Sequence, residues 1–200
     1  PSVTIERRWG VPRFRTDVET ESYLINGEQI GAVAHRGAPV NRTTDRQFHL
    51  RVENSFRKIV RHGDHPNNYW WEITEKNGTK SCFGGTPATG MDISTVLTDA
   101  SGNIAHWALT ETRDLNDNFI KYHYKKITDA GVPGGTVPGY QLYIDNITYT
   151  GHANMEGKYS ALFIYDRDLH ETKRKDVVIN GRLGFKQVTA DLLRNCAKST

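Results

Sequence analysis

The 200-residue sequence has little of several features that would restrict its fold or its location. Its two cysteines, Cys82 and Cys196, lie far apart and match no metal or redox spacing, which predicts two free thiols. No apolar run approaches the ~20 residues that a membrane-spanning helix needs. The first residue is Pro1 and no signal peptide follows it, so we expect a piece of a longer chain whose own N-terminus is missing.

A strong excess of charge of one sign is also absent. The net charge is +3, and acidic and basic residues are interspersed along the chain. Basic runs with interleaved aromatic residues, which are typical of nucleic-acid binding, do not occur. The densest basic stretch is Lys173-Arg174-Lys175, for which a solvated turn is a better interpretation than a binding patch. We therefore expect no nucleic-acid partner.

The sequence also lacks helical periodicity: no segment of ten or more residues shows it strongly. The chain instead has 20 aromatic residues (four Trp, nine Tyr and seven Phe) and 18 glycines, which favour strands and turns. Short alternating segments recur about every ten residues with turn signals between them. We therefore predict an all-β protein of antiparallel sheets built from successive hairpins, as a sandwich or an open shell-like wall, with residues 1–200 forming one domain.

The clearest strand pair spans residues 101–127. Ala105, Trp107 and Leu109 fall on one face of the first strand, and Tyr122 and Tyr124 on one face of the second. This period of two is typical of half-buried strands. The Asp/Asn-rich stretch 114–118 between the two strands predicts a turn.

Other segments have weaker or mixed signals. Asn-Gly pairs at 26–27, 77–78 and 180–181 predict tight turns between strands. The predicted strand 158–166 is apolar on both faces, so we expect it to be covered on both sides. Residues 91–98 could form a short strand or a short helix, and residues 190–197 one or two helical turns. Further strands are predicted at 47–53, 56–62, 69–75, 79–83, 140–150, 177–179 and 185–188.

Three clusters could carry chemistry, but each has a simpler interpretation. Glu19-Thr-Glu21 has the Glu-x-Glu pattern of ADP-ribosyltransferases, yet only 18 residues precede it, so we expect a solvated strand edge. Asp114, Asn116 and Asn118 have the first spacings of a calcium loop, but the glycine and glutamate that should follow are missing, which favours a plain turn.

His62 and His65 lack the third and fourth ligands of a zinc site, and we expect them in an exposed loop. No nucleophile elbow and no phosphate-binding loop is present. The sequence therefore gives no catalytic residue, no metal ligand and no cofactor-binding residue.

Several strings in a consistent order resemble the SpvB family, the N-terminal regions of virulence-plasmid B proteins and of the B component of insecticidal toxin complexes (Tc toxins). The hairpin 101–127 also resembles a diverged Rhs/YD unit. The strings are Arg8-Trp-Gly-Val-Pro12, Glu19-Thr-Glu-Ser-Tyr-Leu-Ile-Asn-Gly-Glu28, Phe56-Arg-Lys-Ile-Val-Arg61, Trp71-Glu-Ile-Thr74 with Asn77-Gly-Thr79, and His106-Trp-Ala-Leu-Thr-Glu111 with Asp114-x-Asn-x-Asn-x-Ile-x-Tyr-x-Tyr124.

The resemblance implies a structural role in a secreted or cell-surface bacterial toxin. In Tc toxins the B component and an Rhs-repeat C component form a hollow β-shell around a toxic segment, and a β-propeller docks on the translocating A component. This chain resembles the region before the propeller. The ADP-ribosyltransferase of the namesake protein follows a polyproline linker at the far C-terminus, so the resemblance transfers no catalytic residue.

Two other functions remain open. A carbohydrate- or surface-binding β-sandwich could stack sugars on exposed aromatics such as Trp70 and Tyr143, although packing is the simpler role for both. A hydrolase with a dispersed site ranks lowest. If the chain is a piece of a shell wall, unpaired strand edges such as 158–166 should make it self-associate.

Overall fold

The computed structural model describes residues 1–8, 10–33, 40–52 and 56–199. The predicted all-β class is confirmed, because nearly all regular structure is antiparallel strand. The described residues contain one short 3₁₀ turn, η1 (Ile93–Thr95), and no helix long and apolar enough to cross a membrane. Residues 91–98, which the sequence left ambiguous, contain both this turn and a short strand, β12 (Val96–Thr98).

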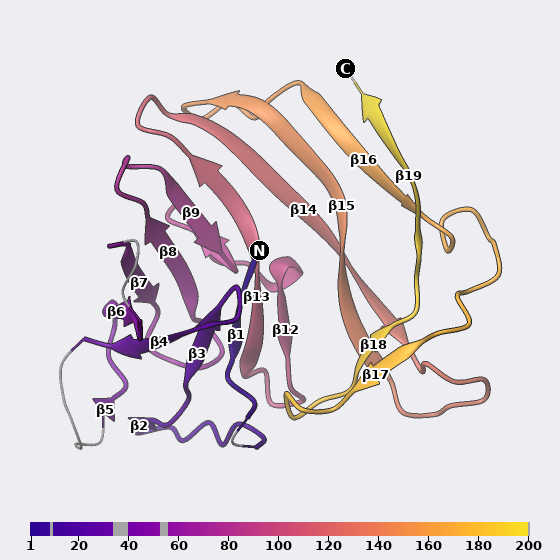
Figure 1. The fold of residues 1–200 in the computed structure, drawn as a ribbon, viewed down its shortest axis with the longest axis horizontal. Coiled ribbons are helices and arrows are strands. Elements are labelled where there is room, and N and C mark those ends of the chain that lie inside the picture. The colour runs from indigo at the N-terminus through magenta and orange to yellow at the C-terminus, as the bar shows by residue number, and fades with distance from the viewer. Residues whose placement is uncertain (9, 34–39, 53–55, 200) are drawn as a thin grey trace.

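Eight strands close into a barrel, seen at the left of Figure 1. Closure comes from β1, which pairs with β3 on one side and with β13 on the other, where Val3 lies opposite Trp107. The barrel strands, in spatial order, are β1 (Ser2–Ile5), β3 (Tyr23–Ile25), β4 (Glu28–Ala32), β6 (Arg46–Leu50), β7 (Lys58–His62), β8 (Trp70–Thr74), β9 (Lys80–Phe83) and β13 (Ile104–Arg113).

A second group of strands, here called the extension, projects from the barrel (Figure 1). It begins where β13 turns into β14, and its four main strands end at β19. A small hairpin, β17 with β18, lies beside the start of β15. The strands of the extension are β14 (Asn118–Asp129), β15 (Gly139–His152), β16 (Tyr159–Tyr165), β17 (Val178–Asn180), β18 (Gln187–Thr189) and β19 (Leu193–Ser199).

Two small ladders complete the structure. The strands β2 (Val18–Glu19) and β5 (Val40–Asn41) pair near the barrel, and β10 (Gly85–Thr86) pairs with β11 (Gly90–Met91). The glycine at 85 is required for the second pair, because a Cβ atom there would meet the backbone oxygen of Gly90 at 2.0 Å.

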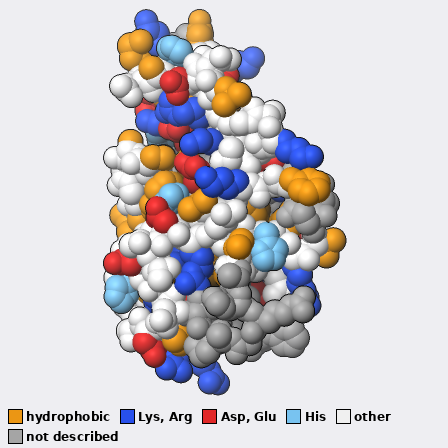
Figure 2. All heavy atoms as spheres, turned by 90° about the vertical axis from the view of Figure 1, so that its left-hand side faces the viewer, with side chains coloured by type: hydrophobic (Ala, Val, Ile, Leu, Met, Phe, Trp, Pro, Cys, Tyr) orange, Lys and Arg blue, Asp and Glu red, His pale blue; other side chains and the backbone are white. Residues whose placement is uncertain are grey.

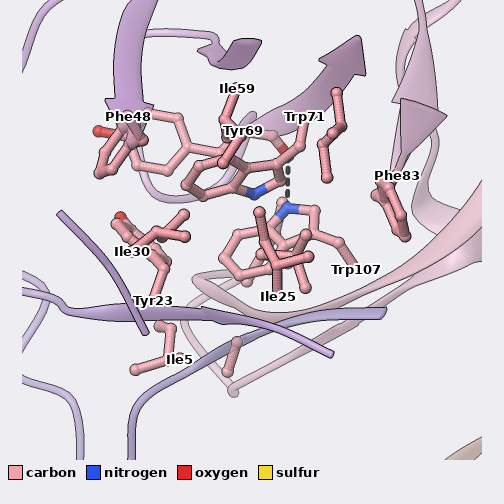
Figure 3. Packing of buried hydrophobic residues seen from close by; sticks show 14 of the residues in the cluster. Ile5, Tyr23, Ile25, Ile30, Phe48, Ile59, Tyr69, Trp71, Phe83 and Trp107 are labelled. Atoms are coloured by element: carbon pink, nitrogen blue, oxygen red, sulfur yellow. Dashed lines mark hydrogen bonds between the residues drawn. The ribbon is translucent and has the colours of Figure 1, made fainter. Parts of the chain in front are cut away.

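Large aromatic side chains fill the barrel. Trp71 packs edge-on against Tyr23, Phe48 and Trp107, with ring centroids 4.8, 5.1 and 5.9 Å apart. Trp107 Nε1 donates a hydrogen bond to the Tyr69 carbonyl oxygen at 2.6 Å, drawn as a dashed line in Figure 3. An eight-stranded barrel has an interior just wide enough for side chains to fill, and here they do so.

The predicted central hairpin is confirmed. Asp114 accepts hydrogen bonds from the backbone N–H groups of Asn116 and Asn118, and Asp117 adopts a positive φ of 61° between β13 and β14. The Asn26-Gly27 turn is also confirmed, with φ angles of 50° and 90°. The hairpin expected around Asn180 is present but has a longer loop, because β18 does not begin until Gln187.

Two expectations for the extension are wrong. The expected helical turns at 190–197 are strand, since β19 pairs with β16 along its length. The expected double coverage of 158–166 also fails, because Tyr159 and Leu162 of β16 keep 46% and 38% of their surface exposed. The second expectation failed because an apolar segment indicates burial, but nothing else in the described chain covers this sheet.

Candidate functional site

A cluster of buried charges lies where the β2–β5 pair meets the barrel. Arg61 points inward from β7, next to Ile59, and its side chain is 0% exposed. It forms an ion pair with Glu19, whose side chain is 4% exposed, and Glu19 also accepts a hydrogen bond from the Tyr23 hydroxyl at 2.9 Å. The Arg61 guanidinium lies 3.9 Å from the centre of the Tyr69 ring, close enough for a cation–π contact.

A second ion pair adjoins the first. Arg42 Nη2 donates to Glu21 Oε1 at 2.8 Å, and both side chains are buried. Arg42 Nη1 also donates to the Tyr69 hydroxyl at 3.1 Å. Burial by itself would lower the pKa of Arg42, but the hydrogen bonds that Arg42 donates to Glu21 and Tyr69, together with the negative charge of Glu21, raise it above its ordinary value. Arg42 therefore stays charged.

The expectation that Glu19 and Glu21 form a solvated strand edge is wrong. Both carboxylates are buried and held by arginines, with Arg46 a further neighbour of Glu19 at 3.5 Å. Glu19 Oε2, Glu21 Oε2 and Arg61 Nε have no hydrogen-bond partner among the described residues. The two carboxylate oxygens are hydrogen-bond acceptors and Arg61 Nε is a donor. An internal water molecule can form hydrogen bonds with both kinds of atom. Each carboxylate is bound by an arginine. This pairing favours a structural role, in which the cluster holds the β2–β5 pair against the barrel.

The other candidate residues identified from the sequence do not come together in one site. Asp114 uses its carboxylate on the turn itself, as predicted. His65 is exposed, as expected, whereas His62 lies in β7 and its Nδ1 contacts Asp45 at 2.8 Å. Among the described residues no group of three or more His, Cys, Asp or Glu side chains could hold a metal ion. The two cysteines are free thiols, as predicted, with Cys82 buried and Cys196 exposed.

The two aromatic residues considered for sugar stacking are buried. Trp70 is 9% exposed and stacks on His62, with ring centroids 4.1 Å apart. Tyr143 is 8% exposed, and its hydroxyl accepts hydrogen bonds from the backbone N–H groups of Ala190 and Asp191. Packing, the simpler interpretation, is therefore confirmed for both, and neither ring offers an exposed stacking face.

A polar cavity of about 260 Å³ lies at the junction between barrel and extension. Its walls include Glu111, Arg113, Lys121 and His123, together with several threonines. Arg113 Nε contacts Glu111 at 2.8 Å, and Glu156 contacts both Lys121 and His123. The basic side chains that line this cavity are therefore each paired with a carboxylate.

The extension has one apolar and one polar face. Cross-strand pairing places Tyr122 opposite Ile147, and Tyr149 opposite Tyr159, all on one side of the sheet. Phe163 of β16 lies on the same side, and we call these five residues the apolar face of the extension. The other side carries Lys121, His123 and Thr148, which gather around Glu156. The apolar face is half-buried near the barrel and becomes exposed at Tyr159.

An ionic latch holds the β17–β18 hairpin against the extension. Arg167 donates two hydrogen bonds to Asp191, at 2.7 and 2.8 Å, and a third to Asp129 at 2.8 Å. Lys173 also pairs with Asp129. Burial by itself would raise the pKa of Asp129, but the hydrogen bonds from Lys173, the Gly131 N–H and Arg167 lower it to about 2. The carboxylate is therefore ionised at neutral pH.

Sequence reasoning missed the arginines of the buried cluster and the latch. A signal for Arg61 existed, because it occupies the inward side of β7 in alternation with Ile59. A cation on the apolar side of a strand predicts a buried anion, and Glu19 and Glu21 were available. No comparable signal marks the latch, because Arg167 and Asp191 are 24 residues apart on irregular segments.

On the barrel side that faces left in Figure 1, cationic, acidic and hydrophobic side chains are interspersed (Figure 2). This mixed surface agrees with the interspersed charge of the sequence. The barrel side in this view therefore differs from the apolar face of the extension, where aromatic side chains lie next to one another.

The fold is shared with two kinds of toxin protein. The N-terminal domain of the effector protein SpvB from Salmonella typhimurium strain LT2 superposes with a TM-score of 0.78 at 17% identity, covering 98% of this chain and 74% of that one. A TcdB2-TccC3-Cdc42 crystal structure gives 0.74 at 16% identity, covering 98% of this chain and 11% of that one. A Photorhabdus luminescens Tc holotoxin pore gives 0.72 at 15%, with the same coverage.

At these identities the structural likeness establishes the fold alone. A search of the curated proteins finds no match. The family model for the Salmonella virulence plasmid 65kDa B protein, SpvB, matches residues 3–169. Except for Ser2 at the start of β1, that range contains all the barrel strands and the first three strands of the extension. This chain therefore belongs to the SpvB family, as its sequence strings indicated.

Proposed function

We propose that this chain is a non-enzymatic structural segment of a toxin-complex B-type subunit. In this role it forms part of the wall of a β-shell that encloses or presents a toxic cargo. The observation that carries the proposal is the extension, a sheet that leaves the barrel with an apolar face exposed at Tyr159. A sheet face of this kind needs cover, which further wall segments would supply.

The barrel supports a scaffolding role because its interior is occupied. Trp71 and Trp107 are fully buried at its centre, and the core cluster includes Tyr23 and Phe48. The charged residues at its end are bound to each other, as in the pair of Arg42 and Glu21. The barrel therefore provides a rigid base from which the extension projects.

The proposal extends to organisation and location. We take residues 1–200 as one structural unit of a longer subunit, preceding a propeller, because β13 continues directly into β14 across the barrel–extension boundary. The proposed partners are an Rhs-repeat component and a translocating component. Family membership supports a secreted or cell-surface location in a bacterium.

The test is assembly of the full subunit with its Rhs-repeat partner. Two serine substitutions, Tyr149→Ser and Tyr159→Ser, would disrupt the apolar face, where these rings stack with centroids 5.8 Å apart. The double variant should reduce co-purification with the partner and protection of the cargo from protease. Val52→Ser, at a residue just after β6 that is 78% exposed, is the control and should assemble normally.

Two results would contradict the proposal. One is full assembly and cargo protection by the Tyr149→Ser/Tyr159→Ser variant. The other is transfer of ADP-ribose to actin by the purified 200-residue chain, which would show that Glu19 and Glu21 serve catalysis and not the clamping of β2–β5.

A further inference from the structure

The loop that joins β17 to β18 reaches from the extension to the barrel (Figure 1). We call residues 181–186 of this loop the tip of the hairpin. Leu183, in the tip, is 3% exposed and belongs to the core cluster of the barrel, and Phe185 packs partly buried against the same cluster. Among the buried members of that cluster in the described part of the chain, only Leu183 comes from beyond β13. The extension is therefore attached to the barrel through this side chain.

The tip meets the barrel just after the end of β1. Arg182 lines a hollow together with Glu6 and Gly27. Gly184, which has a φ of 89°, lies against Val11, where a Cβ atom would come within 3.1 Å of the Val11 side chain. Because β1 runs antiparallel to β13, the end of β1 lies towards the first residues of β13. The tip is therefore seated near the start of β13.

The direct connection between barrel and extension lies at the other end of β13. There β14 pairs with β13 at three positions, from Glu111 opposite Lys121 to Arg113 opposite Phe119. The polar cavity of about 260 Å³ adjoins this ladder, because all four residues line it. A strand rises about 3.3 Å per residue, which places the ladder about 23 Å from Ile104, the first residue of β13. The ladder is therefore short, lies beside a hollow and is remote from the tip, although β12 also lies against β15.

The base of the hairpin is fixed to the extension. Lys186 Nζ donates hydrogen bonds to the carbonyl oxygens of Ala130 and Val137, at 2.6 and 3.1 Å. Val188 is 2% exposed and lies so close to Gly139 that a Cβ atom there would be 2.3 Å from the Val188 side chain. The ionic latch described above secures the chain that follows β18. The hairpin therefore moves with the extension, and its tip bridges to the barrel.

The seat of the tip is weak on either side of Leu183, because Arg182 and Gly184 are both exposed. Arg182 lines two hollows together with Arg7 and Arg8. Arg8 pairs with a buried carboxylate, whereas Arg7 and Arg182 have no ion pair among the described residues. Like charges repel, so these arginines oppose the burial of Leu183.

We propose that the β17–β18 hairpin is a brace with a releasable tip, which fixes the direction of the extension relative to the barrel. With Leu183 seated, the extension is held at both ends of β13. With Leu183 withdrawn, the short β13–β14 ladder is the main connection, and the extension turns about it. One apolar side chain contributes far less than the filled barrel core, so the tip opens while the barrel stays folded. The inference does not rest on the proposed shell role, because it concerns two parts of one chain.

Cys196 provides a site for measuring the direction of the extension. It is exposed on β19, whereas Cys82 is buried, and burial raises the pKa of the Cys82 thiol to about 12. At pH 8 a thiol-reactive acceptor dye therefore labels Cys196 selectively, because thiolates are the reactive form. Time-resolved energy transfer from the barrel tryptophans, which include Trp71 and Trp107, gives the distribution of distances between the two parts.

The experiment compares variants of the 200-residue chain with the wild type. Leu183→Ser should broaden the distance distribution, because it releases the tip, while the near-ultraviolet circular dichroism of the tryptophans stays that of a folded barrel. Adding Arg182→Glu to Leu183→Ser should narrow the distribution again, because the new carboxylate attracts Arg7 and reseats the tip. Val178→Ser is the matched control, since it removes an apolar side chain that is 55% exposed from the same hairpin, and it should change nothing.

Three results would overturn the proposal. The first is an unchanged distance distribution in Leu183→Ser with a folded barrel, which would show that the β13–β14 ladder fixes the extension without the tip. The second is loss of the near-ultraviolet signal in Leu183→Ser, which would make Leu183 a part of the barrel fold and not a releasable contact. The third is a distribution that stays equally broad when Arg182→Glu is added.

Discussion

The barrel and the extension are parts of one continuous sheet, yet they bury their side chains differently. The barrel closes on itself and has an interior filled by Trp71 and Trp107. The extension has no second layer among the described residues, and Tyr159 and Leu193 each keep 46% of their surface exposed. A closed sheet buries its apolar face in its own interior, whereas an open sheet can bury its apolar face only against another layer of structure. The barrel should therefore carry the stability of this chain, and the extension its interactions.

The strongest way to test that comparison is to remove one of the two indole rings that are fully buried in the barrel. Trp107→Ala should lower the free energy of unfolding by about 3–5 kcal/mol, because it leaves a cavity and removes the hydrogen bond to Tyr69. Urea unfolding measures the loss. A loss below about 1 kcal/mol would mean that the barrel is not the stabilising unit.

The buried ion pairs provide the next test. Glu21→Ala should cost about 3 kcal/mol, because Arg42 would remain buried without its carboxylate. The double variant Glu21→Leu/Arg42→Leu removes both charges and should recover most of the loss, which a double-mutant cycle in urea measures. Equal losses in the single and double variants would show that the charges are not coupled.

Local patterns predicted most of the strands because each signal lies within a few residues. The alternation of Trp107 and Leu109, and turns such as Asn26-Gly27, depend only on neighbours in the sequence. Barrel closure does not, because it requires β1 to meet β13 about a hundred residues later. The same limit hid the pairing of Glu19 with Arg61, 42 residues away. Edge position was misjudged for β16 because β19 was expected to be helical.

The extension should loosen in acid before the barrel does. The pKa of Asp129 is lowered to about 2 in the folded chain, below its unfolded value of about 3.9. Its stabilising contribution is therefore complete above about pH 5 and is lost as the pH falls through 4 towards 2, by on the order of 1 kcal/mol. A fluorophore on Cys196 reports the extension, while Trp70, Trp71 and Trp107 report the barrel.

The matched variant for this test is Asp129→Asn, which keeps the shape of the latch and removes the titrating group. It should flatten the pH dependence of the fluorophore signal between pH 4 and pH 2 and leave the tryptophan signal unchanged. If both signals shift together in the wild-type chain, the two regions unfold as one unit and the comparison fails.

The smallest expected effect on stability is on the apolar face, where the effect on association should be the largest. Tyr159→Ser should change the free energy of unfolding by less than about 0.5 kcal/mol, because the ring is already exposed. Leu162→Ser, on the opposite face of β16 and exposed to a similar extent, is the matched control.

In sedimentation over a concentration series, the wild-type chain should self-associate through the apolar face, because the cationic β19 edge disfavours a second copy. Tyr159→Ser should weaken that association and Leu162→Ser should not; the reverse order would place the interacting surface on the polar face.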